Sequence, residues 1–240
     1  MTSQILLEIR SELNKNADPK IKASSKKFFK EKITCYGMKN AVVNKIAREY
    51  WPKAKLLGKN KVFELCEELF ASDYCEEAFI ACNWVPRFAK EFEENDLKTF
   101  EKWINAYVNN WAKCDTFCNH SVGELIEKYP KLVVELKKWA KSKNLWVRRA
   151  AAVSLIIPAK KGLFLREAFE ISDLLLLDEE DLVQKGYGWL LKEESRKHEC
   201  EVFNYVMKNK ARMPRTALRY AIELMSSETR KKAMNKYVQL

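Results

Sequence analysis

The sequence predicts an all-α fold, and three observations support this prediction. Apolar residues recur at three- and four-residue steps in almost every segment, which is the period of an amphipathic helix. Glycine and proline number only six each in 240 residues, which leaves few turns for a sandwich or barrel of many short strands. No stretch alternates apolar and polar residues long enough to indicate a sheet. We therefore expect helices throughout.

The first half of the chain contains three clearly periodic segments. Residues 1–16 read as an amphipathic helix and lack the continuous apolar core of a signal peptide. Residues 64–85 place their apolar side chains on one helical face, and Asp73 is expected to act as an N-cap within them. Residues 92–114 keep the same rhythm as far as Trp111. Each segment thus has one apolar face to bury.

The second half begins at a capping box. In Ser121–Glu124 a serine precedes a glutamate by three residues, which indicates the start of a new helix that Pro130 closes. A cluster of acids at 178–181 suits another helix N-terminus. The remaining helical segments follow in the order 131–142, 144–157, 178–197, 198–209 and 213–225.

The spacing of these helices indicates a repeat architecture. Helix pairs of about 35 to 45 residues with short connections match HEAT-like repeats. Self-similarity between the pairs is weak, so the prediction rests on helix number and spacing. We expect residues 1–240 to form a single domain, a right-handed α-solenoid whose neighbouring repeats line a concave basic groove.

The charge of the chain is compatible with a polyanionic partner. Basic residues exceed acidic ones by 11, and the excess is uneven. Lys141–Arg166 holds seven basic residues and no acid, whereas Glu167–Asp181 holds seven acids and no basic residue. Such blocks predict a basic face and an acidic back. The simpler alternative, that lysines only keep the protein soluble, stays open.

Cysteine usage and hydropathy indicate the compartment. Seven cysteines, an odd number without paired spacing, are typical of reduced thiols. No run approaches the roughly 18 apolar residues of a membrane span. We expect a soluble cytoplasmic protein, associated with the nucleoid in a prokaryote and without a membrane partner.

One stretch, NNWAKCDTFCNH at residues 109–120, could hold a metal or a catalytic group. Cys114, Cys118 and His120 give a C-x3-C-x-H pattern, but zinc takes four protein ligands in structural sites or three in catalytic ones. On a helix, His120 lies about 200° around from Cys118 and away from the face that the cysteines share. We therefore expect no metal here and thiols that pack as small hydrophobes.

The pair Trp111 and Asp115 gives a second interpretation of this stretch. Their spacing of four residues puts indole and carboxylate on one helical face. Asp115 is expected near the C-terminus of its helix, where the macrodipole disfavours a carboxylate. A residue whose charge opposes the preference of its place in a helix is a candidate site residue. The alternative, a core tryptophan beside a solvated or capping aspartate, stays open at this point.

Two further segments hold candidate residues. In NLWVRRAAAV, residues 144–153, an aromatic residue and two arginines precede small residues that let helices approach closely. Gly186 and Gly188 interrupt a helical stretch and cost about 1 kcal/mol each relative to alanine. They indicate the close approach of another helix, or of a ligand beside Trp189. Helix packing and a core tryptophan are the alternatives.

Taken in order, these blocks resemble the DNA alkylation-repair glycosylases of the AlkD type. The resemblance rests on W-x-x-x-D at Trp111–Asp115, on NLWVRRAAAV, on VQKGYGWLLKE and on MPRTALRYAIE, and it spans residues 25–225. It implies helical hairpins with DNA in the concave groove. It also implies hydrolysis of the N-glycosidic bond of N3- and N7-alkylated purines, captured without full base flipping and without a cofactor.

The resemblance implies roles for individual residues. Asp115 matches the family's catalytic aspartate, and Arg149 matches its active-site arginine. Trp111 and Trp189 match the tryptophans that flank the aspartate, and Phe28 falls where related chains carry a tyrosine facing the DNA. The other expected DNA contacts are Lys39, Arg148, Lys160, Lys161, Arg196, Arg215 and Arg219. The expected partner is double-stranded DNA containing alkylated purines, bound by a monomer.

Several positions depart from the family pattern. Ala41 and Asn44 stand where typical members have a proline and an arginine, and Ile157 stands where a lysine is expected. These differences concern DNA contacts rather than the aspartate. An alternative function stays beside the glycosylase, namely a non-catalytic helical-repeat module that binds nucleic acid or an acidic protein partner. Such a module would need no carboxylate exposed on its basic surface.

Overall fold

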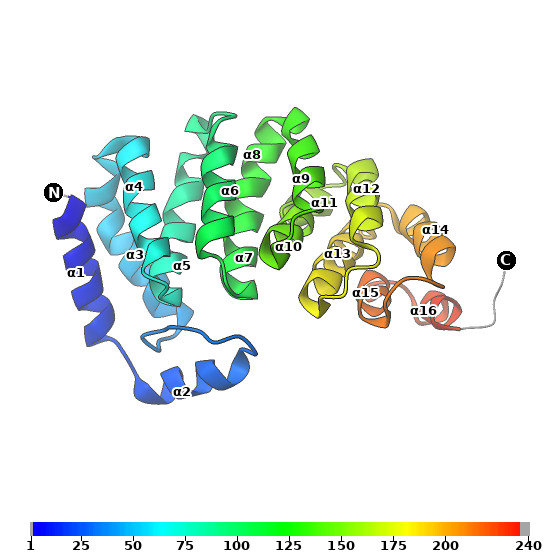
Figure 1. Cartoon of the computed structure of the whole chain (residues 1–240), viewed down its shortest axis with the longest axis horizontal. Coiled ribbons are helices and arrows are strands. Elements are labelled where there is room, and N and C mark those ends of the chain that lie inside the picture. The colour runs from blue at the N-terminus through cyan, green and yellow to red at the C-terminus, as the bar shows by residue number, and fades with distance from the viewer. Residues whose placement is uncertain (1, 236–240) are drawn as a thin grey trace. The chain divides into compact units, whose positions relative to one another are not determined.

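The computed structural model describes residues 2–235, and these residues form helices joined mostly by short loops, with a longer connection at residues 29–39 between α2 and α3 (Figure 1). The only β-type pairing among them is an isolated parallel bridge between Thr34 and Tyr74. The predicted all-α fold is therefore confirmed. No helix of the described residues is long and apolar enough to cross a membrane.

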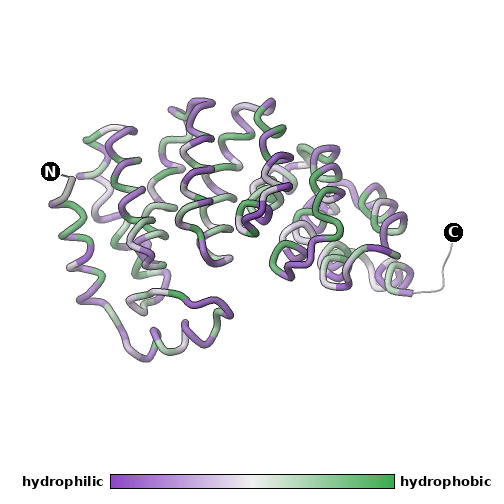
Figure 2. The backbone as a smooth tube through the Cα atoms, viewed as in Figure 1, coloured by the Kyte–Doolittle hydropathy of each residue, from purple (hydrophilic) through white to green (hydrophobic). Residues whose placement is uncertain are grey.

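The chain divides into two compact units, Met1–Leu125 and Ile126–Leu240. The single domain expected over residues 1–240 remains a prediction. In each unit a helix packs mainly on helices one to three positions away along the chain, as in a helical repeat array. Figure 2 shows hydrophobic and hydrophilic residues alternating along most of the helices, the pattern of helices with an apolar face for a neighbour and a polar face for solvent.

The first unit is built around helices α3 to α7. Its core contains the fully buried rings of Trp84, Trp103 and Phe117, packed between these helices. The elements of this half are α1 (Thr2–Lys15), α2 (Pro19–Phe28), α3 (Asn40–Lys55), α4 (Gly58–Ala71), α5 (Cys75–Trp84), a 3₁₀ helix (Val85–Glu91), α6 (Asp96–Tyr107), α7 (Trp111–Phe117), a π-helical turn (Cys118–Val122) and α8 (Gly123–Lys128).

The second unit is organised around α13, which contacts helices α10, α11, α12, α14 and α15. Tyr187 of α13 is fully buried and donates a hydrogen bond to the carbonyl of Leu176 at 3.1 Å. The elements are a 3₁₀ helix (Pro130–Leu132), α9 (Val133–Trp139), α10 (Leu145–Val153), α11 (Ile156–Lys160), α12 (Leu165–Leu175), α13 (Asp181–Glu194), α14 (Glu199–Asn209), α15 (Arg215–Ala221) and α16 (Ser227–Met234).

One helix boundary differs from the prediction and changes how the candidate site is understood. The segment 92–114 is not a single helix, because α6 ends at Tyr107 and α7 begins at Trp111. Asn110 caps the new helix, since its side chain accepts a hydrogen bond from the Lys113 N–H at 3.0 Å. Trp111 is therefore the first residue of a helix rather than the last turn of one.

The capping box predicted at Ser121–Glu124 is wrong. The backbone continues from α7 through the π turn Cys118–Val122 into α8, with the Gly123 N–H bonded to the Cys118 carbonyl. Ser121 lies inside this continuous helix, where its hydroxyl is buried and lacks a hydrogen-bond partner. Single π turns within α-helices are often found at functional sites.

The N-cap predicted at Asp73 is also wrong. The residue that precedes α5 is Tyr74, and Asp73 has a left-handed backbone with φ of 66°. Aspartate tolerates this conformation better than most residues. Its carboxylate is used for tertiary contacts instead of capping.

Candidate active site

The start of α7 is anchored by an ion pair between a buried lysine and a half-exposed aspartate. The Lys113 side chain is 1% exposed, and its ammonium donates to Asp73 Oδ1 at 2.8 Å, to the Asp73 carbonyl at 2.9 Å and to Asn109 Oδ1 at 3.0 Å. Thr34 donates to the other Asp73 oxygen at 2.9 Å. Burial alone would raise the pKa of Asp73, but hydrogen bonds from Lys113, Thr34 and Asn109 hold it below its ordinary value. These contacts fix the position of the first turn of α7.

Trp111 and Asp115 flank Lys113 on this anchored helix. Asp115 stands in the second turn from the N-terminus, so its expected place near a helix C-terminus is wrong. Asp115 is 9% exposed, and Trp111 is half-buried. The predicted sharing of one helical face is confirmed, because both residues line the same pocket.

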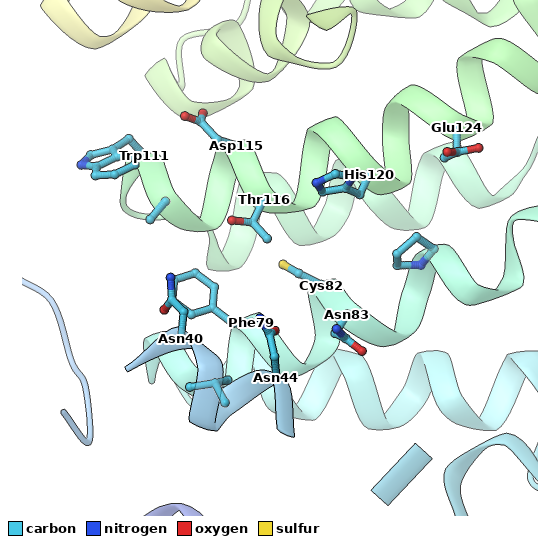
Figure 3. A pocket seen from close by; sticks show the side chains of 13 residues that line it. Asn40, Asn44, Phe79, Cys82, Asn83, Trp111, Asp115, Thr116, His120 and Glu124 are labelled. Carbon is cyan, nitrogen blue, oxygen red and sulfur yellow. The ribbon is translucent and has the colours of Figure 1, made fainter. Parts of the chain in front are cut away.

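This pocket, called the α7 pocket below, has a volume of about 500 Å³ and lies wholly within the first unit. Figure 3 shows two rows of side chains: one from the α7–α8 helix, the other from α3 and α5. Thr116 points from α7 toward the other row, and Trp111 and Asp115 stand at one edge, with the Asp115 carboxylate on the side of α7 away from α3 and α5. The lining residues are Asn40, Val43, Asn44, Phe79, Cys82, Asn83, Pro86, Trp111, Ala112, Asp115, Thr116, His120 and Glu124.

An aromatic cluster extends from Trp111 to the molecular surface. Phe29 stacks on Trp111 with ring centroids 5.3 Å apart, and Phe28 meets Trp111 edge-on at 5.8 Å. Phe28 is 70% exposed at the C-terminal end of α2, and Lys26 and Lys27 precede it in the same helical turn. The structure thus brings Phe28, Trp111 and Asp115 of the predicted site together.

In the second unit, Arg149 lies on α10 and is 5% exposed. Its guanidinium donates to the carbonyl of Leu182 just inside α13. A Cβ atom at Gly186 would lie 3.4 Å from the Arg149 Cγ, so this glycine leaves room for the arginine stem. The close approach predicted from Gly186 is confirmed, and Arg149 is the side chain that approaches.

Gly188 makes room for a neighbouring helix. A Cβ atom there would lie 2.8 Å from Tyr220 Cβ and 2.9 Å from the Ala217 carbonyl oxygen. Helix α15 therefore packs directly against the backbone of α13. The helix-packing interpretation of this glycine is confirmed.

Trp189 of α13 is half-buried and is oriented by its own helix. Its indole N–H donates to Glu193 Oε1 at 3.0 Å, and the other oxygen of Glu193 accepts from Arg196. Glu193 is 3% exposed; burial would raise its pKa, but the hydrogen bonds from Arg196 and Trp189 hold the pKa below its ordinary value. A charged carboxylate thus fixes the indole.

The predicted basic contacts fall into two groups. Lys39, Lys160, Arg215 and Arg219 have exposed side chains. The other three bind carboxylates: Arg148 Nε donates to Asp178 at 2.6 Å, Lys161 Nζ to Glu127 at 2.7 Å, and Arg196 to Glu193. Arg148 also donates to the carbonyls of Ser142 and Lys143, which holds the loop before α10 in place.

Sequence reasoning missed two features of the first unit. The ion pair of Lys113 with Asp73 joins residues 40 positions apart, and no local pattern indicates it. The amide row of Asn40, Asn44 and Asn83 comes from two helices, α3 and α5, that only the tertiary fold brings opposite α7. Of the described residues, no group of three or more His, Cys, Asp or Glu could hold a metal ion, and Cys114 and Cys118 are buried and form no disulfide.

The fold and the pocket define an all-α helical-repeat protein with an aspartate and a tryptophan at the edge of a cavity that has both polar and apolar walls. A sequence model of the family described as "DNA alkylation repair enzyme" matches residues 9–225, and the chain belongs to this family. Family membership supports a role in the repair of alkylated DNA. No curated protein sequence matches the chain significantly.

Two solved structures are similar to this fold. One is described as a predicted DNA alkylation repair enzyme from Enterococcus faecalis, with a TM-score of 0.79 and 15% identity over 88% of this chain and 98% of that one. The other is smu.31 from Streptococcus mutans UA159, with a TM-score of 0.52 and 20% identity over 82% of this chain and 98% of that one. At these identities the likeness shows the helical-repeat fold alone.

Proposed function

We propose that this protein is a DNA glycosylase that hydrolyses the N-glycosidic bond of N3- and N7-alkylated purines in double-stranded DNA. The observation that supports it most is the placement of Asp115, a largely buried carboxylate beside the Trp111 indole at the edge of a pocket with both polar and apolar walls. Membership in the DNA alkylation repair enzyme family supports the same class of substrate.

The proposed chemistry follows from the charge of the substrate. An alkylated N3 or N7 purine is cationic, so it can leave with the electron pair of the C1′–N bond as a neutral base. Positive charge then grows on the deoxyribose as an oxocarbenium-like species. The Asp115 carboxylate stabilises that charge and accepts a proton from the water that adds to C1′.

The other site residues assist binding in this proposal. The Trp111 and Trp189 indoles offer faces for cation–π attraction to the charged sugar or base, worth about 0.5 to 2 kcal/mol each. The exposed ring of Phe28 contacts the DNA, and Arg149, which is 5% exposed, turns from the Leu182 carbonyl to pair with a phosphate beside the lesion. The exposed side chains of Lys39, Lys160, Arg215 and Arg219 hold the backbone electrostatically.

The test is release of free base from methylated duplex DNA. We expect the protein to release 7-methylguanine and 3-methyladenine and to leave one abasic site for each base released. Chromatography of the supernatant and cleavage of abasic sites in the DNA measure the two products. Binding to the duplex without release of either base would contradict the proposal and support the non-catalytic repeat module.

A further inference from the structure

A second cavity of the first unit lies beside the α7 pocket and contains two thiols. It has a volume of about 230 Å³ and shares Phe79 and Trp111 with the α7 pocket. Cys35, from the connection between α2 and α3, and Cys75, the first residue of α5, both line it. Neither cysteine forms a disulfide in the structure. The proposed hydrolysis uses neither thiol.

The backbone holds these two cysteines next to each other. Thr34 and Tyr74, the residues that precede them, form the parallel bridge, and the Cys75 N–H donates to the Thr34 carbonyl at 2.9 Å. Backbones paired in this way lie about 4.8 Å apart. A disulfide joins Cα atoms that are roughly 4.4 to 6.8 Å apart. The residues that follow the bridge therefore start at a separation that a disulfide can span.

The direction of the side chains also brings the two thiols together. On either side of Cys35, the Thr34 hydroxyl donates to Asp73 and the Tyr36 ring stacks on another tyrosine. Because side chains alternate along a β-type segment, Cys35 faces the opposite side. There Cys35 and Cys75 belong to one buried apolar cluster.

The thiols are buried, but a small oxidant can reach them. Cys35 is 3% exposed and Cys75 is 4% exposed. The cavity that they line exceeds the roughly 30 Å³ that a water molecule occupies. Burial raises the pKa of both thiols, that of Cys75 to about 12. Because the thiolate is the reactive form, oxidation is slow at neutral pH, and the pair responds to sustained oxidation.

We propose that Cys35 and Cys75 form a reversible disulfide when the protein is exposed to hydrogen peroxide. One thiolate attacks the O–O bond and becomes a sulfenic acid, and the other peroxide oxygen leaves as water. The second thiol then displaces the sulfenic hydroxyl as water, and the S–S bond forms. The two sulfurs together lose two electrons, which reduce the peroxide. A dithiol reductant reverses the reaction by thiol–disulfide exchange.

The disulfide would tie one edge of the candidate site to the core of the first unit. Cys35 belongs to the 29–39 connection, whose first aromatic ring stacks on Trp111. Cys75 begins α5, and its Sγ accepts a hydrogen bond at 3.7 Å from the side chain of Asn110, the N-cap of α7. The bond thus links the segment that packs on Trp111 to the helix start that supports it, and it restricts the movement of that segment.

Mass spectrometry of the full chain tests the disulfide. Cys200→Ser serves as the parent protein, because the exposed Cys200 would otherwise join two chains. After treatment with hydrogen peroxide at mildly alkaline pH, we expect the intact mass to fall by that of two hydrogen atoms. A cross-link should join the tryptic peptides 33–39 and 62–87 through Cys75, and dithiothreitol should remove it. Oxidation without a disulfide, or a disulfide between other cysteines, would overturn the proposal.

Cysteine variants confirm the assignment. Cys35→Ala and Cys75→Ala should each abolish the cross-link. Cys66→Ala, at another buried cysteine of the same unit, is the matched control and should keep it. Circular dichroism and thermal unfolding check that each variant is folded, and valine replaces any alanine variant that is not. A loss of intact mass that persists in the Cys35 and Cys75 variants would place the oxidation elsewhere and contradict the proposal.

Hydrogen exchange tests the effect on the edge of the site. Amides of residues 29–39 should exchange at least about tenfold more slowly in the oxidised protein, because the disulfide restricts local opening. Cys35→Ala treated with the same oxidant is the control and should show no change. Equal exchange in the reduced and disulfide-bonded proteins would contradict the restriction of this segment. These measurements need no DNA, so they are independent of the proposed glycosylase function.

Discussion

Each of the two units presents one candidate site tryptophan, and the two are held in different ways. Trp111 begins α7, whose first turn is fixed by an ion pair from Lys113 to Asp73, 40 residues earlier in the chain. Trp189 lies within α13 and is bonded to Glu193 four residues later in the same helix. One indole depends on a long-range anchor of its backbone, the other on a local partner of its side chain.

This difference determines which mutations can separate function from stability. In the first unit the anchoring groups, Lys113 and Asp73, are distinct from the pocket residues Trp111 and Asp115. In the second unit Arg149 is itself buried and bonded to the start of α13, so its removal changes packing as well as any contact with DNA. The first unit is therefore the better place to test chemistry.

The buried acids of the two units differ as well. Glu76 accepts hydrogen bonds from the N–H groups of Tyr36 and Gly37, and Glu77 accepts from Tyr36 and Arg10. Glu194 in the second unit is fully buried, and neither of its oxygens has a hydrogen-bond partner. Burial, with a smaller contribution from Glu167, raises the pKa of Glu194 to about 8.

The largest expected effect is a pH dependence caused by Glu194. Because the folded-state pKa of about 8 lies above the ordinary value of 4.5, the folded state holds the proton more tightly than the unfolded state. The contribution of Glu194 to the free energy of unfolding is complete below about pH 4.5. It decreases as pH rises, by about 3 kcal/mol between pH 5 and 8. Urea unfolding of wild type and Glu194→Gln across this range measures it.

The glutamine variant should lose this pH slope and be more stable than wild type at pH 8. A wild-type protein whose free energy of unfolding follows the same pH course as Glu194→Gln would show that Glu194 is ionised in the fold. It would then need a partner that the structure does not contain.

The second effect concerns the anchor of α7. Asp73→Asn tolerates the left-handed backbone but leaves the Lys113 ammonium, 1% exposed, without its counter-ion. We expect a loss of about 2 to 3 kcal/mol in the free energy of unfolding. Lys113→Met should cost less, about 1 kcal/mol, because the Asp73 side chain that remains is 45% exposed. Urea unfolding of both variants and of the double variant gives the comparison.

The double variant should be no less stable than Asp73→Asn alone, since the stranded charge is gone. Additive losses in the double variant would mean that the two side chains act independently. The coupling free energy between Lys113 and Asp73 would then be zero, and their contact would not stabilise the fold as an ion pair.

The smallest effect concerns the orientation of Trp189. Glu193→Leu removes the acceptor of the indole N–H and frees Arg196. Under the proposed function we expect base excision to slow about three- to tenfold, equivalent to about 1 kcal/mol, while duplex affinity is unchanged or higher. Single-turnover kinetics check this. The control is Glu201→Leu, a substitution of the same kind at an exposed position. Equal excision rates would show that the orientation of Trp189 does not matter to the reaction.

The sequence was sufficient for the fold because helical period is a local signal. It also placed Trp111 and Asp115 on one face, since that follows from a spacing of four residues alone. The identities of Gly186 and Gly188 indicated close packing that the structure confirms. Each of these predictions depends on residues within one or two turns of each other.

Predictions failed where a distant residue decides the local structure. The break before Trp111 depends on Asn110 and on the Lys113–Asp73 pair, whose second member is remote in sequence. The sequence of Ser121–Glu124 matches a capping box, but the helix does not start there, because it continues through these residues by a π turn. The amides of α3 and α5 face α7 only in the folded unit, so no motif could have indicated the pocket.

The central claim is that Asp115 stabilises the charge that develops on the sugar, and one rate comparison tests it most directly. Single-turnover excision of 7-methylguanine from a duplex should be at least about 100-fold slower in Asp115→Asn, equivalent to about 3 kcal/mol of transition-state stabilisation. Duplex affinity should be equal or higher, because a negative charge is removed. Glu64→Gln, an exposed acid of the same unit, controls for net charge and should excise at the wild-type rate. Equal rates for wild type and Asp115→Asn would contradict the account.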